Sequence, residues 1–419
     1  MLGRKNSSPK LVAEDRYGGG TKKKISSQPK RQKQQPIHEE PAKRGNIFTR
    51  IIGWIIRTIL TLIWRVFWRG AVIVSAMIAI AIGYLFLELP KAGALLDGRT
   101  RGSVTLLDYK GDVFAWRGDQ FGGAINAKSV SKHLHNAVIA TEDRRFYLHF
   151  GLSPRGIASA VRINLTEGRG PLSGHGGSTI TQQTAKLLCL GVPFDPRKWK
   201  SERDYERDCR EGSLWRKLKE AIYSVAMETR YTKDEILAIY LNRAFLGAGA
   251  RGFEAAAQRY FGKSAAEVSI SESAMLAGLL VAPSRYAPTN NLVRSQDRAQ
   301  LIIGLMKAQG FLSPEEAAYA RGNPAVLSAA AQAKSGGYFA DWVMQSGPSF
   351  FTQNTTEDVI IKTTLDQSVQ KAAEEGLNFI FENQVRAESK AQVAIVVMSA
   401  NGAVRAMVGG RKSIVSGAF

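Results

Sequence analysis

Acidic, basic and amide side chains recur in five short groups along the middle of the chain. The groups are Glu142–Gly151 (EDRRFYLHFG), Gly176–Gln183 (GGSTITQQ), Arg216–Glu220 (RKLKE), Lys233–Asn242 (KDEILAIYLN) and Arg251–Lys263. A carboxylate such as Glu142 can take a proton from an attacking hydroxyl as a general base. Lysine and arginine can stabilise the negative charge that develops on a leaving group. One carboxylate beside an arginine is by itself only a helix-surface ion pair, so the interpretation depends on the order of all five groups.

In this order, and over roughly residues 101–317, the five groups resemble the glycosyltransferase domain of class A penicillin-binding proteins. The resemblance implies a peptidoglycan glycosyltransferase that polymerises lipid II into glycan strands. In that reaction the 4-hydroxyl of an acceptor sugar attacks the anomeric carbon of a donor sugar, with inversion, and a lipid pyrophosphate departs. The implied fold is mainly α: a lysozyme-like helical domain behind one transmembrane helix, followed by a small α+β linker.

The resemblance also assigns roles to individual residues. Glu142 matches the catalytic glutamate of the family, the general base on the acceptor hydroxyl. Glu220 matches the second acidic residue of the family. Three roles remain for it: holding the nearby lysine and arginine in place, binding a divalent ion, or assisting the leaving group. Lys186 matches a position that contacts the donor pyrophosphate. The other candidate substrate-binding residues are Asp143, Phe146, His149, Ser178, Thr179, Gln182, Gln183, Arg216 and Lys217.

Spacing predicts how the first group is presented. Phe146 and His149 are three apart, so they are expected to share one helix face. We expect His149 to hydrogen bond rather than to transfer protons, and Asp143 to orient its neighbours. A divalent cation, Mg²⁺ or Mn²⁺, is the one cofactor considered for the site.

The second group predicts a capped helix. Ser178 is expected to cap a helix over 179–188, which would place Gln182, Gln183 and Lys186 on one face. The glycine-rich stretch just before it, at 165–177, reads as a mobile loop beside the site.

One segment, 189–212, departs from the family pattern. It is an insertion dense in charge, and we interpret it as a surface loop. Relatives commonly carry an arginine at the position of Gly212, and Arg210 is the nearby residue that could replace it. The chain's two cysteines, Cys189 and Cys209, lie in this segment. The sequence leaves open whether they form a disulfide or remain one buried and one exposed thiol.

Residues 100–320 are assigned to the glycosyltransferase domain. It opens with two alternating runs, 103–108 and 112–116, which predict a strand pair. The helical period dominates afterwards: Ser213 is a plausible N-cap of an amphipathic helix, and 271–280 reads as a buried helix.

A linker is expected at 321–390. It includes a strand-like run at 359–366 that resembles the strand joining the two catalytic domains of the family. Residues 391–419 resemble the start of a transpeptidase domain and predict a β-hairpin around Ala400-Asn401-Gly402. Ser-x-x-Lys, Ser-x-Asn and Lys-Thr/Ser-Gly do not occur in the order that this chemistry needs. We therefore expect neither transpeptidase activity nor penicillin binding from this chain.

The amino-terminal region predicts a membrane anchor. Residues 1–46 are basic and nearly free of large apolar side chains, which predicts a disordered cytoplasmic tail. Residues 47–69 predict a basic amphipathic juxtamembrane helix. Residues 70–89 are long and apolar enough to cross a membrane once. The basic residues before this span predict a cytoplasmic amino terminus, so the catalytic domain would face outward from a bacterial inner membrane.

The formal charge of +21 raises the alternative of a nucleic-acid partner. We disfavour it, because much of the excess lies in a tail next to a membrane span. The expected partners are lipid II and the growing glycan strand, the inner membrane, and cell-division or elongation proteins. Two other functions are kept: a lysozyme-like hydrolase that cuts glycan strands, and a membrane-anchored scaffold without enzyme activity.

Overall fold

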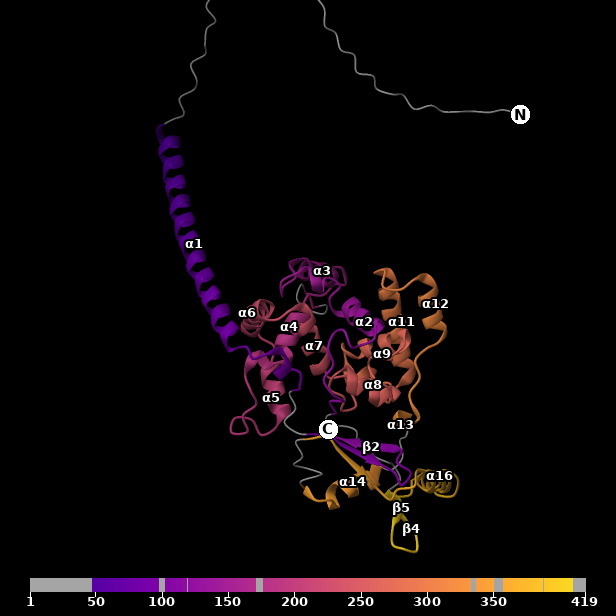
Figure 1. Cartoon of the computed structure of the whole chain (residues 1–419). Helices are drawn as coiled ribbons and strands as arrows, with labels where there is room; N and C mark the ends of the chain where they lie inside the picture. The colour runs from indigo at the N-terminus through magenta and orange to yellow at the C-terminus, as the bar shows by residue number, and fades with distance from the viewer. Residues whose placement is uncertain are drawn as a thin grey trace, which may run out of the picture. The chain divides into compact units, whose positions relative to one another are not determined.

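The computed structural model describes residues 47–97, 102–118, 120–170, 176–332, 337–349, 357–386 and 388–409. The chain divides into two compact units, Met1–Gly70 and Ala71–Phe419. The second unit contains a large helical part and a smaller part with strands (Figure 1). This architecture confirms the predicted mainly α fold class. The predicted disordered tail lies outside the described residues, as do residues 171–175 of the predicted mobile loop.

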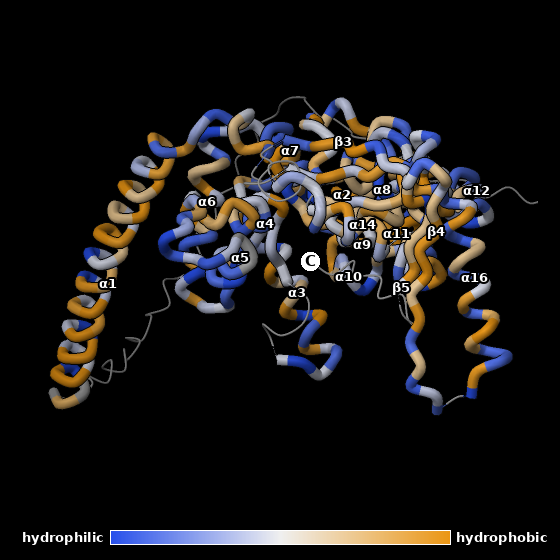
Figure 2. The backbone as a smooth tube through the Cα atoms, turned by 90° about the horizontal axis from the view of Figure 1, so that it is seen from below, coloured by the Kyte–Doolittle hydropathy of each residue, from blue (hydrophilic) through white to orange (hydrophobic). Residues whose placement is uncertain are grey.

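The first helix, α1 (Ile47–Glu88), is one continuous element of 42 residues. The sequence predicted two segments that divide at Gly70, but one glycine costs a helix only about 1 kcal/mol, and no proline interrupts the run. Its apolar stretch, Arg50–Glu88, is the one helix in the described part that is long and apolar enough to cross a membrane. Figure 2 shows hydrophobic positions along most of α1, with hydrophilic ones between them.

Three short 3-10 turns and a series of α-helices follow α1 in the described residues. The 3-10 turns are η1 (Ala92–Leu95), η2 (Phe146–Leu148) and η3 (Cys189–Gly191). The longer α-helices are α2 (Lys132–Glu142), α3 (Pro154–Thr166), α4 (Ile180–Leu187), α5 (Glu202–Cys209), α6 (Leu214–Arg230), α7 (Lys233–Arg243), α8 (Phe253–Phe261), α9 (Ile270–Leu279) and α11 (Leu292–Ala308). Short or peripheral helices follow: α10 (Pro283–Tyr286), α12 (Pro314–Gly322), α13 (Ala329–Gln332), α14 (Gly337–Ser346) and α16 (Gln367–Asn383).

Local sequence sets where several of these helices begin. The helices α4, α7, α9 and α12 each start with a capping box, in which Ser or Thr and a Glu or Gln three residues later satisfy two backbone N–H groups. Ser213 caps α6 as predicted, its hydroxyl accepting from the backbone N–H of Arg216. The predicted buried helix at 271–280 is α9, one residue earlier at each end.

Helix α9 forms the centre of the main hydrophobic core. Nearly all of its residues are buried, as expected for a helix that is apolar on all sides. It packs against α2, α8 and α11. Helix α2 also packs against α11, so the end of α2 that carries Glu142 is fixed on the core.

Two small sheets follow the predicted strand runs. β1 (Val104–Leu107) pairs antiparallel with β2 (Val113–Arg117), as predicted. β1 also pairs in parallel with β3 (Val359–Lys362), so segments before and after the helical part share one sheet. β4 (Ala394–Met398) and β5 (Val404–Gly409) form the predicted hairpin, with α14 and α16 packed against β5 (Figure 1).

A buried amide joins α7 to the segment before α2. Asn242 is 2% exposed. Its Nδ2 donates to the carbonyls of Ile125 at 2.6 Å and Ala238 at 2.7 Å, and its Oδ1 accepts from the N–H of Ile125 at 3.0 Å. Gly252 lies against it with φ +84°, where a Cβ would come within 2.8 Å of the carbonyl oxygen of Asn242. One side chain therefore satisfies both polar groups of a neighbouring peptide segment.

We predict that Asn242→Leu lowers the free energy of unfolding by about 2–4 kcal/mol, because it leaves the N–H and C=O of Ile125 without partners. Chemical denaturation followed by circular dichroism would measure the loss. The matched control is Asn383→Leu, which removes an exposed amide that also donates to a carbonyl four residues earlier, at 2.9 Å. Equal losses for the two variants would contradict the prediction.

Candidate active site

Glu142 is the last residue of α2 and its side chain is partly exposed. Its Oε2 accepts a hydrogen bond from Gln183 Nε2 at 2.8 Å, and Gln183 Oε1 accepts from the hydroxyl of the buried Tyr240 at 3.2 Å. Burial raises the pKa of Glu142 above its usual range. The bond from Gln183 and the charge of Arg298 act in the opposite direction, and the charge of Asp143 adds to the rise. A carboxyl with a raised pKa, held by one neutral donor, has the properties of a general base.

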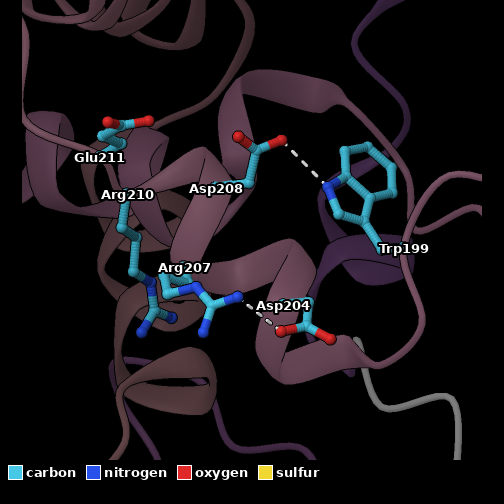
Figure 3. A pocket seen from close by; sticks show the side chains of 6 residues that line it. All are labelled: Trp199, Asp204, Arg207, Asp208, Arg210 and Glu211. Atoms are coloured by element: carbon cyan, nitrogen blue, oxygen red, sulfur yellow. Dashed lines mark hydrogen bonds and ion pairs between the residues drawn. The ribbon is translucent and has the colours of Figure 1, made fainter.

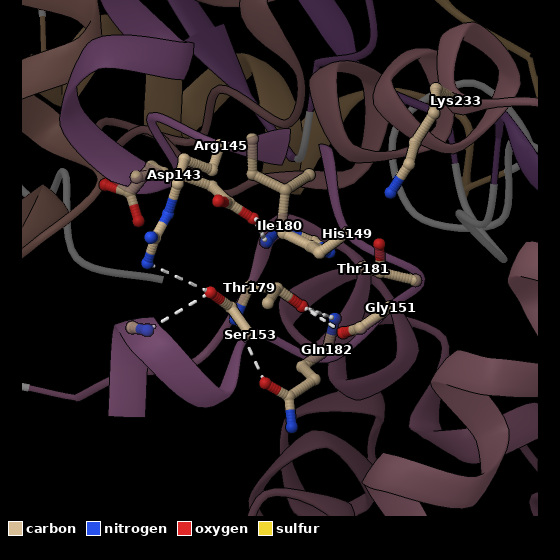
Figure 4. A network of polar contacts seen from close by, with 12 residues as sticks. Asp143, Arg145, His149, Gly151, Ser153, Thr179, Ile180, Thr181, Gln182 and Lys233 are labelled. Atoms are coloured by element: carbon tan, nitrogen blue, oxygen red, sulfur yellow. Dashed lines mark hydrogen bonds and ion pairs between the residues drawn. The ribbon is translucent and has the colours of Figure 1, made fainter. Parts of the chain in front are cut away.

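The next residue, Asp143, connects three segments of the site (Figure 4). Its Oδ2 lies 2.8 Å from His149 Nε2 and accepts from the backbone N–H of Ile180 at 3.2 Å. The contact with Ile180 ties the end of α2 to the first turn of α4. Asp143 is 9% exposed, and these contacts give it an orienting position.

Two details of the first group differ from the prediction. Phe146 begins the 3-10 turn η2, and His149 follows it in extended backbone, so the two do not share an α-helical face. Their rings still meet edge to face, with centroids 6.3 Å apart. Phe146 is fully buried, with the ammonium of Lys233 4.5 Å from its ring centroid. The structure places Phe146 in the core rather than toward a substrate.

The second group is also corrected in detail. Thr179, not Ser178, caps α4: its hydroxyl accepts from the N–H of Gln182, and Gln182 Oε1 accepts from the N–H of Thr179. Gln182 is thereby turned to the backbone and buried, because a capping box uses both side chains. The hydroxyl of Thr179 also donates to the carbonyl of Gly151 at 2.6 Å, as Figure 4 shows. Gln183 points to Glu142 instead.

A cluster of cations surrounds Glu220. This carboxylate is 1% exposed, with Arg216 Nη1 at 2.5 Å from one oxygen and Lys217 Nζ at 2.7 Å from the other. Lys217 also donates to Ser178 Oγ at 3.0 Å. Both cations keep some exposure, 15% for the side chain of Arg216 and 45% for that of Lys217. A buried carboxylate thus holds two cations at the surface of the site, where an anion could reach them.

Lys186 lies close to this cluster. Burial lowers the pKa of its ammonium, and the charges of Arg216, Arg210 and Lys217 lower it further, while Glu220 opposes them. Lys186 is three residues after Gln183 on α4, which is about 4.5 Å along a helix. Since α4 packs against both α6 and α7, one helix links the carboxylate Glu142 to the cation cluster.

The insertion at 189–212 is structured. Cys189 and Cys209 form a disulfide with a Cα–Cα distance of 5.4 Å. Between them lie η3 and α5, so the predicted surface loop is a closed loop with a helix of its own. A cavity of about 660 Å³ is lined by Trp199, Asp204, Arg207, Asp208, Arg210 and Glu211 (Figure 3).

The acidic residues of the site do not form a metal-binding set. Among the described residues, no group of three His, Cys, Asp or Glu side chains is placed to hold a metal ion. Both oxygens of Glu220 are engaged by cations, and Asp143 is engaged by His149 and Ile180. A divalent cation at the site stays a prediction.

Sequence reasoning missed several contacts that support the site. Glu228 is buried between Thr181 Oγ1, at 2.6 Å, and Lys233 Nζ, at 2.7 Å, which joins α4, α6 and the start of α7. Tyr240 lies behind Gln183, and the charge of Arg298 acts on Glu142. Lys233 and Tyr240 belong to the fourth group, so that group carried a signal. The position of Arg298 depends on the packing of α11 and had no signal in the spacing.

Comparison with known proteins shows which family this part of the chain resembles. Residues 111–307 match the Transglycosylase family. The chain is similar to penicillin-binding protein 1A of Aquifex aeolicus, with 34% identity over 317 residues that cover 73% of this chain and 40% of that protein. For penicillin-binding protein 1A of Escherichia coli the identity is 31% over 297 residues, which cover 70% of this chain and 32% of that protein.

A solved structure is also similar: the crystal structure of penicillin-binding protein 1A from Haemophilus influenzae. It is 21% identical, with a TM-score of 0.36, covering 73% of this chain and 33% of that chain. The chain spans 40% of the length of the Aquifex relative and 32% of that of the Escherichia coli relative. The resemblance predicted from the five groups is confirmed: residues 111–307 are a transglycosylase domain, similar to the class A penicillin-binding proteins.

Proposed function

We propose that this chain is a peptidoglycan glycosyltransferase that polymerises lipid II into glycan strands. The observation that carries the proposal is the arrangement on α4. Gln183 donates to the carboxylate of Glu142, and Lys186, one turn later, lies near the cations held by Glu220. Helix α4 thus holds the proton acceptor at the end of α2 through Gln183, and itself carries a cation for an anionic leaving group. Transfer from a lipid pyrophosphate requires both groups at fixed positions.

In the proposed mechanism Glu142 is the general base. The oxygen of the acceptor 4-hydroxyl forms a bond to the donor anomeric carbon, while its proton passes to the carboxylate of Glu142. The bond from the anomeric carbon to the pyrophosphate oxygen breaks, and its electron pair leaves with the lipid pyrophosphate. Lys186, Arg216 and Lys217 meet the charge that develops there. Glu220 holds two of these cations rather than accepting the proton.

We also propose a single-pass protein of the bacterial inner membrane, with its catalytic domain outside. The apolar helix α1 supports the span. The disulfide between Cys189 and Cys209 supports the orientation, because disulfides persist in oxidising compartments. The thirteen Lys or Arg residues against four acids in the first fifty residues support a cytoplasmic amino terminus. Division or elongation proteins stay predicted partners.

The first test replaces the base. Glu142→Gln should lower the rate of lipid II polymerisation by about 10²–10⁴-fold, the range that a general base contributes, while the variant stays folded. Gel analysis of glycan length would measure it. The control is Glu315→Gln, which neutralises an exposed carboxylate on α12. Full polymerisation by Glu142→Gln would overturn the role of Glu142. Release of soluble fragments from preformed peptidoglycan, without polymer from lipid II, would indicate a hydrolase. A protein that shows neither activity would favour the scaffold alternative.

The raised pKa of Glu142 predicts a pH dependence. A general base works only when deprotonated, so kcat/KM should fall as the pH is lowered through the pKa of Glu142. Because burial raises that pKa above 4.5, the acid limb should lie at higher pH than for an ordinary glutamate.

Gln183→Leu should move this limb to still higher pH, since the bond from Gln183 lowers the pKa of Glu142. Initial rates across a pH series would measure the midpoint of the limb. Gln300→Leu, on α11, removes an amide that donates to the carbonyl of Arg321 and should leave the midpoint unchanged. A midpoint that does not move, or moves to lower pH, in Gln183→Leu would contradict the prediction.

A further inference from the structure

The insertion at 189–212 is a rigid unit of its own. The disulfide closes it, and aromatic rings pack inside it. The ring of Tyr205 meets Trp199 edge to face, with centroids 5.0 Å apart, and meets Phe194 at 5.8 Å. Glu206 lies 2.6 Å from Arg251 Nη1, which fixes the unit to the helical domain. The walls of the insertion are therefore set before any ligand binds, which keeps the entropic cost of binding low.

The cavity of about 660 Å³ in this unit is lined by three carboxylates, two guanidinium groups and one indole (Figure 3). Asp204, Arg207 and Asp208 belong to α5, where spacings of three and four residues place them on one face. Arg207 Nη2 lies 2.7 Å from Asp204 Oδ1. Asp208 Oδ2 accepts from the indole N–H of Trp199 at 2.9 Å. The cavity therefore presents charged hydrogen-bond donors and charged acceptors together.

Two of the charged groups keep capacity for a ligand. Among the described residues, none pairs with the carboxylate of Glu211, and its backbone carbonyl is the group that accepts from Arg216 Nε at 2.7 Å. The side chain of Arg207 is 78% exposed and engages Asp204 through Nη2, so its other N–H groups face solvent. Three carboxylates against two guanidinium groups disfavour a ligand with negative charge alone. A ligand that carries both an amine and carboxylates fits this lining.

The cavity lies next to the cations proposed for the leaving group. The Glu211 carbonyl joins its wall to Arg216, which also pairs with Glu220. In lipid II the muramyl sugar that bears the pyrophosphate also bears a short peptide, with free carboxylates and a free amine on its diamino acid. A peptide of five residues extends to at most about 17 Å. A donor whose pyrophosphate lies at these cations therefore has its peptide within reach of the cavity.

We propose that this cavity binds the peptide of the lipid-linked donor, with Glu211 meeting the amine and Arg207 meeting a carboxylate. The inference rests on the proposed function and deepens it, because it adds recognition of the peptide to a reaction that takes place at the sugar. The insertion lies outside the five groups, so this recognition is a property of the insertion rather than of the shared site. A contact far from the reacting atoms, equally strong in the ground state and the transition state, changes KM rather than kcat.

The first experiment varies enzyme and substrate together. In the full chain in detergent, Glu211→Gln should raise KM about tenfold for lipid II with a free peptide amine, the size of one charge-assisted contact, and leave kcat within about twofold. For lipid II acetylated on that amine, the same substitution should leave KM unchanged, because the charge that Glu211 meets is gone. The matched control, Asp195→Asn, lies in the insertion outside the cavity lining and should change neither KM. An equal rise for both substrates, or no rise for either, would overturn the proposal.

A binding assay separates this inference from the proposed function. Titration calorimetry with the water-soluble muramyl pentapeptide measures Kd without lipid and without turnover, and circular dichroism shows that each variant is folded. Glu211→Gln and Arg207→Gln should each weaken Kd about tenfold, Arg207→Lys should recover part of the loss because the charge stays, and Asp195→Asn should bind as the wild type does. No binding by the wild type, or equal Kd values for wild type, Glu211→Gln and Arg207→Gln, would refute the inference. A wild type that binds the peptide in this pattern but makes no polymer from lipid II would refute the proposed function and leave the peptide site standing.

Discussion

The site depends on one buried charge, the carboxylate of Glu220, which is 1% exposed. A carboxylate in that environment is very unfavourable unless cations pair with it. Arg216 and Lys217 each take one of its oxygens, and loss of either contact would leave one buried oxygen without its charged partner. The cations are thus held in position before any substrate arrives, which is the condition for electrostatic stabilisation of a leaving group. Lys217 extends the constraint to Ser178, just before α4.

Helix α4 connects this cation cluster with Glu142, the proposed base, through Gln183. Burial shifts the pKa of Glu142 upward and that of Lys186 downward, so in both residues it disfavours the charged form. At Glu142 the result is a stronger base. At Lys186 an anionic ligand would reverse the shift, because a negative charge favours the ammonium form. The same burial therefore prepares opposite responses at Glu142, which ends α2, and at Lys186 on α4.

The fourth and fifth groups act mainly as supports. Lys233 pairs with the buried Glu228, Asn242 holds the segment before α2, and Arg251 pairs with Glu206 of the insertion. In the same way the insertion, which has no place in the five groups, reaches the site through its disulfide and the carbonyl of Glu211. The proposed chemistry involves few side chains. The supporting polar residues hold together the elements that carry them.

The sequence alone determined the features that depend on residues close together in the chain. The capping residues fixed the starts of α6 and α9, alternation predicted the strand pairs, and the five groups identified the transglycosylase domain. The tertiary structure decided what depends on distant neighbours. The Cys189–Cys209 disulfide joins residues whose separation in space no local pattern encodes. The complete burial of Phe146 likewise depends on elements far from it in the sequence. The tertiary structure also decided that Thr179 rather than Ser178 caps α4, because Thr179 has the Gly151 carbonyl as a partner for its own hydroxyl.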